Sequence, residues 1–337
     1  MNNTKPPKTI DQLMSHMNDK KNKNMLLISG EEEKQKLRHI GYFHGYKGYR
    51  YYKSPNTILP YKDFNELYAV YDFDSKVKAI LYPQIMFLET TIKNYSLEII
   101  MDDSKKSDFH SIYNDLLNEY KKSLYSSKKS LSAYKKSLQK KMRLQDKIHK
   151  SIYSNYNKKY DHIVGHYYDK DNDIPIWAIF ELISLGEFGN FISCLDEKIK
   201  KKISKSIGLN YSYDPQGILL EKFIFALKDL RNAIAHNDVI FDTRFKNGEI
   251  SNTIIKYITN ETEEKEVNFQ TITDYIIMIS ILLSALQCNK ESILNLISDF
   301  ENCCEQLRSS VDISIYHKIL STRNKNKILC IKNFIKK

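Results

Sequence analysis

The spacing of apolar residues along the chain is that of helices. Apolar positions recur every three or four residues through most of the sequence, which predicts an all-α fold. Asp63 and Glu66 have the spacing of a capping box and open a long helical pattern over residues 64–99. Pro83 is expected to kink this helix or to divide it in two. Residues 41–61 are punctuated by Gly and Pro, so an irregular or weakly extended segment is expected there.

The second half of the chain continues the helical pattern. Helices are predicted over about 216–237 and about 270–300, and the apolar run YIIMISILLSAL within the latter is typical of a buried helix. Between them the Asn-Gly pair at 247–248 indicates a tight turn, and with it a small β-hairpin near residues 240–260. The Lys-rich tail, residues 323–337, is expected to fray.

The predicted organisation is a leader and Gly/Tyr-rich segment at 1–60, followed by a helical domain over 61–337 with a basic helical insertion at 110–160. Within this insertion, over 119–160, the tetrapeptide KKSL occurs three times with a period of seven residues. The repeat places Leu124, Leu131 and Leu138 on one apolar stripe with Lys pairs beside it, which predicts an amphipathic basic helix.

Positive charge is concentrated in this insertion. The chain has a formal net charge of +11, and between residues 120 and 150 ten Lys and one Arg face a single acid, Asp146. Such an element attracts polyanions, so RNA is the expected partner and an acidic membrane surface the competitor. A face that is merely solvated is an equal alternative. The candidate RNA-binding residues are Lys121, Lys122, Lys128, Lys129, Lys135, Lys136, Lys140, Lys141 and Arg143.

Cysteine usage and apolar segments indicate a cytoplasmic protein. The five Cys have neither a CxxC spacing nor a His-paired metal spacing, so no metal site and no cofactor are predicted. The N-terminal segment MNNTKPPKTIDQLM lacks the apolar core of a signal peptide, and the longest apolar run is too short to span a bilayer. We therefore expect a soluble protein in a reducing compartment, with no membrane partner.

The stretch KDLRNAIAHND, residues 228–238, interrupts an apolar helix with charged and titratable groups. On a helical wheel the core-facing side is formed by Leu220, Phe223, Leu227, Leu230 and Ile234. Asn232 and His236 lie on nearly the opposite side, which is also apolar further back, at Ile218 and Phe225. Both sides are therefore expected to be covered, the second by another part of the chain or by a second copy of the protein.

The motif has a structural interpretation. His236 and Asn237 would end the helix and satisfy its last carbonyl groups, while Arg231 would pair with an acid such as Asp229 or Glu221. Short Arg/His patterns often occur by chance, which favours this interpretation for an isolated match.

Two other pairs in the chain also satisfy the pattern Arg-x(4–6)-His. Arg38 with His44 lies in the Gly-broken segment, and Arg143 with His149 lies on the basic helix. Only Arg231 is followed directly by a polar residue and preceded by an apolar helix. The context therefore singles out this motif for a chemical interpretation.

In the chemical interpretation His236 is a general acid/base, because an imidazole with an ordinary pKa near ~6.5 exchanges protons at neutral pH. Arg231 would stabilise the charge that develops on a phosphorane, and Asn232 would orient the phosphate or the His. This set suits RNA cleavage by attack of the 2′-OH on the adjacent phosphate, without a metal. Two copies of the motif would supply both the base and the acid.

Several segments, taken together, resemble the Abi family (AbiD/AbiF-like) of bacterial abortive-infection proteins. They are GYFHGYKGYRYY (41–52), the 64–99 segment with its Tyr-x-Phe-Asp and Leu-Glu elements, and IPIWAIFELISLGEFGNF (174–191). RNAIAHN (231–237) resembles the Arg-x(4–6)-His signature of HEPN domains, which are all-α and often act as metal-independent endoribonucleases.

The resemblance implies a HEPN-like helical bundle, a homodimer with a composite site, and a role in phage defence or a toxin system. It carries over Arg231, Asn232 and His236 as catalytic candidates, with Asn237 and Glu89 as weaker supports. Where such families usually show Arg after the Leu-Glu element, this chain has Lys93, which lacks the bidentate geometry of Arg. We therefore expect Lys93 to form a structural ion pair with Glu89. The basic helix would be a docking surface for a structured noncoding RNA or an antitoxin RNA.

Two further functions remain open. The chain could bind or sense RNA through the basic helix without cleaving it, in which case binding would depend strongly on salt. It could also be a membrane-surface or protein-interaction module that uses the amphipathic basic helix.

Overall fold

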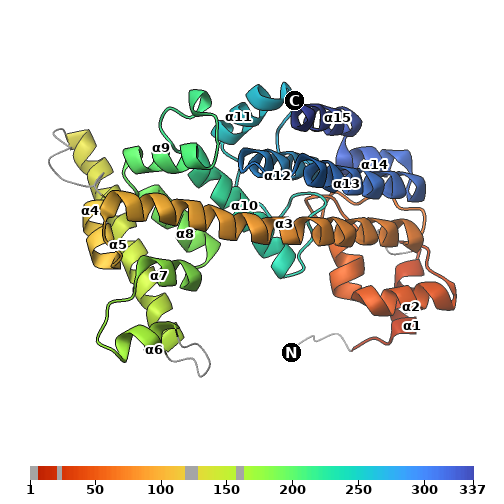
Figure 1. Ribbon diagram of the computed structural model, residues 1–337. Coiled ribbons are helices and arrows are strands. Elements are labelled where there is room, and N and C mark those ends of the chain that lie inside the picture. The colour runs from red at the N-terminus through yellow and green to blue at the C-terminus, as the bar shows by residue number, and fades with distance from the viewer. Residues whose placement is uncertain (1–6, 21–24, 118–127, 157–162) are drawn as a thin grey trace.

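The computed structural model describes residues 7–20, 25–117, 128–156 and 163–337, and within these ranges the chain forms helices and no β-strand (Figure 1). The predicted all-α fold is confirmed. The helices are α1 (Ile10–Asn18), α2 (Gly30–Ile40), α3 (Phe64–Ser104), α4 (Phe109–Asp115), α5 (Lys128–Tyr156), α6 (Ile163–Tyr168), α7 (Ile176–Leu182), α8 (Leu185–Cys194), α9 (Glu197–Ser206), α10 (Leu219–Ala235), α11 (Asn252–Thr262), α12 (Thr273–Ala285), α13 (Lys290–Ser310), α14 (Ile313–Leu320) and α15 (Asn324–Lys336), with a π-helix η1 (Gly41–Lys47) and a 3₁₀ turn η4 (Tyr211–Tyr213).

The 41-residue helix α3 is the spine of the fold. It begins where the Asp63 side chain accepts hydrogen bonds from the N–H groups of Asn65 and Glu66, as the capping pattern predicts. The expected division at Pro83 is wrong, because the helix continues through this residue. Pro83 and Ala79, four residues earlier, are both exposed, so water can solvate the carbonyl group that Pro83 leaves without a donor.

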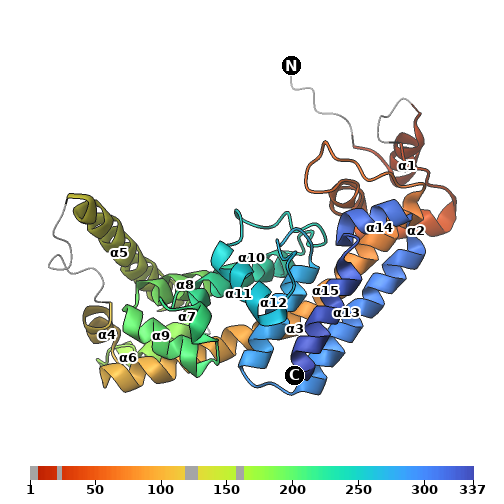
Figure 2. The same cartoon turned by 90° about the horizontal axis from the view of Figure 1, so that it is seen from above.

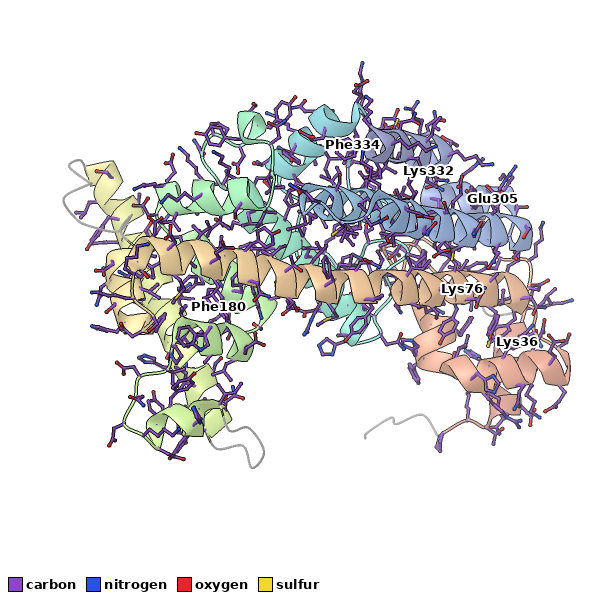
Figure 3. The ribbon with its side chains drawn as sticks, viewed as in Figure 1. Lys36, Lys76, Phe180, Glu305, Lys332 and Phe334 are labelled. Carbon is purple, nitrogen blue, oxygen red and sulfur yellow. The ribbon has the colours of Figure 1, made fainter. Side chains whose placement is uncertain are left out.

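Other helices pack along α3 in two groups (Figure 2). The first part of α3 packs on α13 and α2, and its last part packs on α4, α7 and α9. Figure 3 shows a labelled residue in each part: Lys76 of α3, whose Nζ donates to Gln306 of α13 at 2.9 Å, and Phe180 of α7, which contacts Phe188 and Phe191 of α8. In Figure 1 α1–α2 and α6–α7 lie below opposite ends of α3, and α10 crosses it between them.

The most apolar helix, α12, is enclosed by the other C-terminal helices. All residues from Thr273 to Leu283 of α12 are buried, which agrees with the prediction of a buried helix. The single helix predicted over 270–300 is two helices, because Gln287 has φ +56° and ends α12 before α13 begins. No helix in the described ranges combines the length and the apolar content that crossing a membrane would require.

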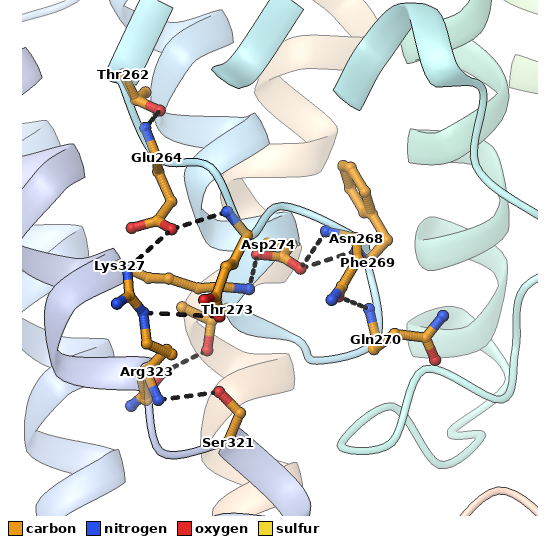
Figure 4. A network of polar contacts seen from close by, with 12 residues as sticks. Thr262, Glu264, Asn268, Phe269, Gln270, Thr273, Asp274, Ser321, Arg323 and Lys327 are labelled. Carbon is orange, nitrogen blue, oxygen red and sulfur yellow. Dashed lines mark hydrogen bonds and ion pairs between the residues drawn. The ribbon is translucent and has the colours of Figure 1, made fainter. Parts of the chain in front are cut away.

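The expected fraying of the tail is wrong, because residues 324–336 form the packed helix α15. Ile328, Ile331 and Ile335 are spaced for one helical face and are buried against α12 and α13. Lys327 is buried as well, and its Nζ lies 2.7 Å from Oδ1 of Asp274 (Figure 4). Oδ2 of Asp274 accepts the N–H groups of Asn268 and Phe269. Burial raises the pKa of Asp274, and the ammonium group and the two amides oppose this.

The predicted hairpin near 240–260 is wrong. Residues 239–250 form turns, and the segment after them is α11, which begins at the Ser251 cap. Its buried residues, Ile254, Tyr257 and Ile258, have helical spacing and face α10. The Asn-Gly pair does form a tight loop, in which the Asn247 side chain donates to Asp229 of α10 at 2.9 Å.

The basic helix is confirmed over Lys128–Tyr156, and the rest of the predicted 119–160 lies outside the described residues. Leu124, from the predicted stripe, is among the residues outside. Leu131 is 36% exposed, so the stripe is not buried in the first part of α5. The buried residues come later, at Leu144, Ile148 and Ile152, where α5 packs on α7 and α8. Figure 2 shows the first turns of α5 projecting from the body.

Candidate active site at the end of α10

The helix α10 positions the motif at its C-terminal end. Leu220, Phe223, Leu227 and Leu230 are buried, which confirms the predicted core-facing side. The second side is covered by the chain itself along its first half, because α8 packs there: a Cβ at Gly189 of α8 would lie 3.2 Å from the ring of Phe225. This cover stops before the motif, and Asn232 and His236 are exposed.

The backbone after the motif closes the helix in a Schellman arrangement. The N–H of Asp238 donates to the carbonyl of Ala233 at 2.7 Å, and the N–H of Asn237 donates to that of Ile234 at 3.0 Å. Asn237 has φ +55°, the left-handed conformation that such a cap requires. Backbone hydrogen bonds therefore close the helix. The side chains of His236 and Asn237 are not needed to satisfy its last carbonyl groups.

Arg231 is held by Glu89 of α3. Its Nε lies 3.6 Å from Oε2 of Glu89, and the Glu89 side chain is only 10% exposed. The acids proposed in the structural interpretation, Asp229 and Glu221, pair instead with Lys228 and with Lys140 and Lys222. Glu89, a residue that only the resemblance indicated, is therefore the partner that orients the guanidinium group.

The expected ion pair of Lys93 with Glu89 is confirmed at 3.4 Å. Nζ of Lys93 also donates to the carbonyl of Ile183 at 3.1 Å, so Lys93 ties Glu89 to the segment between α7 and α8. The guanidinium group of Arg231 is one-third exposed, and its Nη1 lies 3.4 Å from Oδ1 of Asn232. The buried carboxylate of Glu89 thus lies at ion-pair distance from one edge of Arg231, without a hydrogen bond between Nε and Oε2, and the other edge is accessible to an anion.

His236 is exposed, as Asn232 is. Its ring makes no hydrogen bond or ion pair to any part of the chain that the structure describes. Arg231, Asn232 and His236 lie within six residues at the end of α10, and of their side chains those of Arg231 and Asn232 are in contact. An accessible imidazole can exchange a proton with a phosphodiester that a nearby guanidinium group binds.

Asn237 links the motif to a polar network that the sequence did not reveal. Its Oδ1 accepts from Nζ of Lys78 at 3.0 Å, and its Nδ2 lies 3.1 Å from Nε2 of His44. Lys78 lies 2.8 Å from Asp74, a fully buried residue four positions earlier on α3. The signals in the sequence were the Tyr-x-Phe-Asp element that ends at Asp74 and the pair Arg38/His44, which was set aside for its Gly-broken context.

Asp74 is the buried anchor of this network. One of its oxygens accepts the N–H groups of Ile240 and Phe241 at 2.9 and 2.6 Å, and the other accepts the hydroxyl of Tyr49 at 2.6 Å. Burial and the neighbouring carboxylate raise the pKa of Tyr49, so its hydroxyl remains a donor. Three donors and the ammonium group of Lys78 therefore satisfy this carboxylate within the core.

The basic residues of α5 lie apart from the motif. Lys140 is 3.9 Å from Glu221, near the start of α10, whereas Arg231 lies ten residues further along the helix, about 15 Å away along its axis. Lys136, Lys140, Arg143 and Lys147 line a cavity of about 320 Å³ with Asn190 of α8.

The other predicted RNA-binding residues are placed differently. Lys141 packs over the ring of Tyr113 at 4.2 Å and donates to the carbonyl of Leu117, so it has a structural role. Lys135 is exposed. The backbones of Lys128 and Lys129 open α5, and Lys121 and Lys122 lie outside the described residues.

Comparison with known proteins gives one match. The family model described as Abi-like protein matches residues 35–242, a range that begins in α2 and ends just after the motif. It includes η1, α3, α5 and α10, and so contains every residue of the group around Arg231 and of the network around Asp74. No curated protein and no solved structure gives a significant match.

Proposed function

The chain belongs to the Abi-like protein family, which associates it with abortive infection in phage defence, and we propose that it acts there as a HEPN-type endoribonuclease. The observations that carry the proposal are the exposed imidazole of His236 at the end of α10 and, five residues earlier on the same helix, Arg231, which lies at ion-pair distance from the buried carboxylate of Glu89.

The proposed reaction is a transesterification of RNA. One imidazole takes the proton of a 2′-OH, the 2′-oxygen attacks the adjacent phosphorus, and the bond from phosphorus to the 5′-oxygen breaks. A second imidazole protonates the leaving 5′-oxygen, so the products are a 2′,3′-cyclic phosphate and a 5′-hydroxyl. Arg231 stabilises the charge on the phosphorane, and Asn232 orients the phosphate or the neighbouring ring. These groups suffice without a metal ion.

The second imidazole is proposed to come from a second copy of the chain. His236 lies where the cover provided by α8 has ended, so a partner can approach this face. In a twofold arrangement each copy would contribute Arg231 and His236 to one cleft.

The test is cleavage of a labelled single-stranded RNA in the presence of EDTA. Replacing His236 by Ala is expected to lower the rate by roughly 10²–10⁴-fold, the usual contribution of a general acid or base. His39→Ala, which changes an exposed imidazole on α2, is the matched control and should cleave normally. Sedimentation should show the same oligomeric state for both. Equal cleavage by the two variants would remove the assignment.

A second candidate function, RNA binding without cleavage, is favoured by the basic cavity between α5 and α8. Its lining carries four cations, two amides and no carboxylate, a composition suited to the backbone of a structured RNA. Replacing Lys136 and Arg143 by Gln should weaken binding and reduce its salt dependence by roughly one phosphate contact per residue.

The matched control for this experiment replaces Lys135 and Lys150 by Gln, which removes the same charge from α5 outside the cavity. If both double variants bind RNA equally, the cavity is not the binding site. Cleavage separates the two functions, since a protein that only binds RNA gives no cyclic phosphate product.

A further inference from the structure

His44 lies beside the motif although 193 positions separate it from Asn237. It belongs to η1, a π-helical turn, and such wide turns often occur at functional sites. The turn depends on Gly45, because a Cβ there would lie 2.3 Å from the side chain of Ile40. The ring of His44 is exposed, with Nε2 directed at the Asn237 amide.

The hydrogen bonds around Asn237 fix which nitrogen of His44 carries the proton. An ammonium group has only hydrogens to offer, so the atom of Asn237 that faces Lys78 is the oxygen Oδ1, and the atom that faces His44 is the nitrogen Nδ2. An amide nitrogen only donates. Nε2 of His44 is therefore the acceptor, and the neutral ring carries its proton on Nδ1.

The orientation of the His44 ring is fixed in the free protein. The amide of Asn237 is fixed by Lys78, and Lys78 is fixed by Asp74 at 2.8 Å. Asp74 is in turn fixed by the backbone N–H groups of residues 240 and 241, just beyond the motif. Donors that are oriented during folding do not reorganise during a reaction, which is why they stabilise charge effectively.

We infer that His44 is a further residue of the active site, one that donates a hydrogen bond from Nδ1 to an oxygen of the RNA phosphodiester. The inference rests on the proposed function. Within the part of the chain that the structure describes, Nδ1 has no hydrogen-bond partner, and the ring contacts Asn237, the residue that follows His236. His44 thus supplies a neutral donor, while His236 exchanges protons. Loss of one such donor lowers kcat by roughly 10²–10³-fold.

Two substitutions distinguish donation from Nδ1 from other roles. The amide nitrogen of Asn is separated from Cα by the same number of bonds as Nδ1 of His, and that of Gln by the same number as Nε2. His44→Gln should therefore lose roughly 10²-fold in kcat while RNA binding changes little, and His44→Asn should retain most of the activity. His39→Gln, on the neighbouring helix α2, is the control.

The pH profile of cleavage separates a donor from a proton-transfer group. Because Nδ1 carries a hydrogen whether or not Nε2 is protonated, His44 can donate across the profile, and His44→Gln should lower the whole profile and leave both of its limbs in place. Loss of a limb, or equal losses in the Asn and Gln variants, would overturn the proposed role. Unchanged cleavage by His44→Gln would also overturn it.

Nuclear magnetic resonance of the ¹⁵N-labelled histidines tests the contact without cleavage. In the free protein His44 should be protonated on Nδ1, and Asn237→Ala should change the Nε2 signal. A 2′-deoxy analogue of the RNA, which cannot be cleaved, should shift the Nδ1 signal on binding. If the protein cleaves no RNA, the proposed function fails. An Nδ1 signal that does not shift on binding contradicts the His44 contact, whether or not the protein cleaves RNA.

Discussion

Two buried Asp–Lys pairs in this protein have nearly the same local chemistry but differ in the residues that they contact next. Asp274 with Lys327 and Asp74 with Lys78 are separated by 2.7 and 2.8 Å, and both carboxylates are fully buried. Each Asp also accepts two backbone N–H groups from the loop that follows a neighbouring helix. The first pair ends between α12 and α15. The second continues through Lys78 to Asn237 and the exposed ring of His44.

The difference shows that burial and pairing do not by themselves identify a functional residue. A buried ion pair adds little net stability compared with apolar residues of similar volume, because desolvation offsets the attraction. What distinguishes the Asp74 pair is its next contact, an amide that orients a surface imidazole. We interpret the Asp274 pair as part of helix packing and the Asp74 pair as the support of the candidate site.

The largest effect on stability is expected from Lys327→Met. The change leaves Asp274 buried without its cation, and breaking such a pair costs about 3–5 kcal/mol of the free energy of unfolding. Cleavage per folded molecule should not change, because the pair does not reach the motif. Urea denaturation measures the first effect and the RNA assay the second.

The control on the same helix is Lys332→Met. Lys332 pairs with Glu301 in a partly exposed position, so the loss should stay below about 1 kcal/mol. Equal losses of the free energy of unfolding in Lys327→Met and Lys332→Met would show that the burial of the Asp274–Lys327 pair does not affect stability.

A somewhat smaller loss of stability, about 3 kcal/mol, is expected from Lys78→Met, because Nζ of Lys78 lies closer to solvent. Here cleavage per folded molecule should also fall, since Asn237 loses the donor that orients its amide. The two Lys→Met variants thus form a matched pair. If cleavage falls equally in both, or in neither, the two ion pairs do not differ in function.

A still smaller effect on stability is expected from Asn237→Gly. Glycine adopts φ +55° without strain, so the cap of α10 is kept. The buried ammonium group of Lys78 loses the acceptor Oδ1, so the free energy of unfolding should fall by about 1–2 kcal/mol. The hydrogen bond to His44 is lost, which should lower cleavage roughly tenfold, the equivalent of one such bond.

Asn237→Ala separates the cap from the amide. It also removes the bond to His44, but unlike glycine it keeps a Cβ in the left-handed conformation, which costs about 1–2 kcal/mol relative to the Gly variant. The two variants should therefore cleave alike and differ in stability. If only the Ala variant loses activity, the strain of the cap, and not the amide, affects cleavage.

The sequence predicted those parts of the site that lie on one helix. The core side of α10 and the placement of Asn232 and His236 on its other side follow from the helical period, and the pair of Glu89 with Lys93 follows from a separation of four residues. Local spacing is sufficient for such contacts, because the helix itself fixes the distances.

Contacts between distant segments could not be predicted in this way. His44 meets Asn237 only after η1 and α10 have both packed on α3, and no local pattern encodes that meeting. The hairpin and the frayed tail were wrong for another reason. In both cases a compositional signal, Asn-Gly or Lys richness, was given more weight than the helical spacing of the Ile and Tyr residues nearby.

An exposed Asp–Lys pair provides the reference for both buried ones and is expected to have the smallest effect. Asp312 lies 3.1 Å from Lys62, and both side chains are solvated. The pKa of Asp312 is lowered to about 2, first by hydrogen bonds from the backbone and hydroxyl of Ser314 at the start of α14 and only then by Lys62.

Because the folded pKa of Asp312 is below its unfolded value, its charge stabilises the fold above about pH 4, and this contribution is lost as the pH falls towards 2. Asp312→Asn retains a cap acceptor without the charge, so the urea midpoints of the two proteins should differ at pH 6 and converge towards pH 3. Lys62→Met should leave most of this pH dependence in place. A dependence that disappears with Lys62 would mean that the ion pair, and not the helix cap, holds the charge on Asp312.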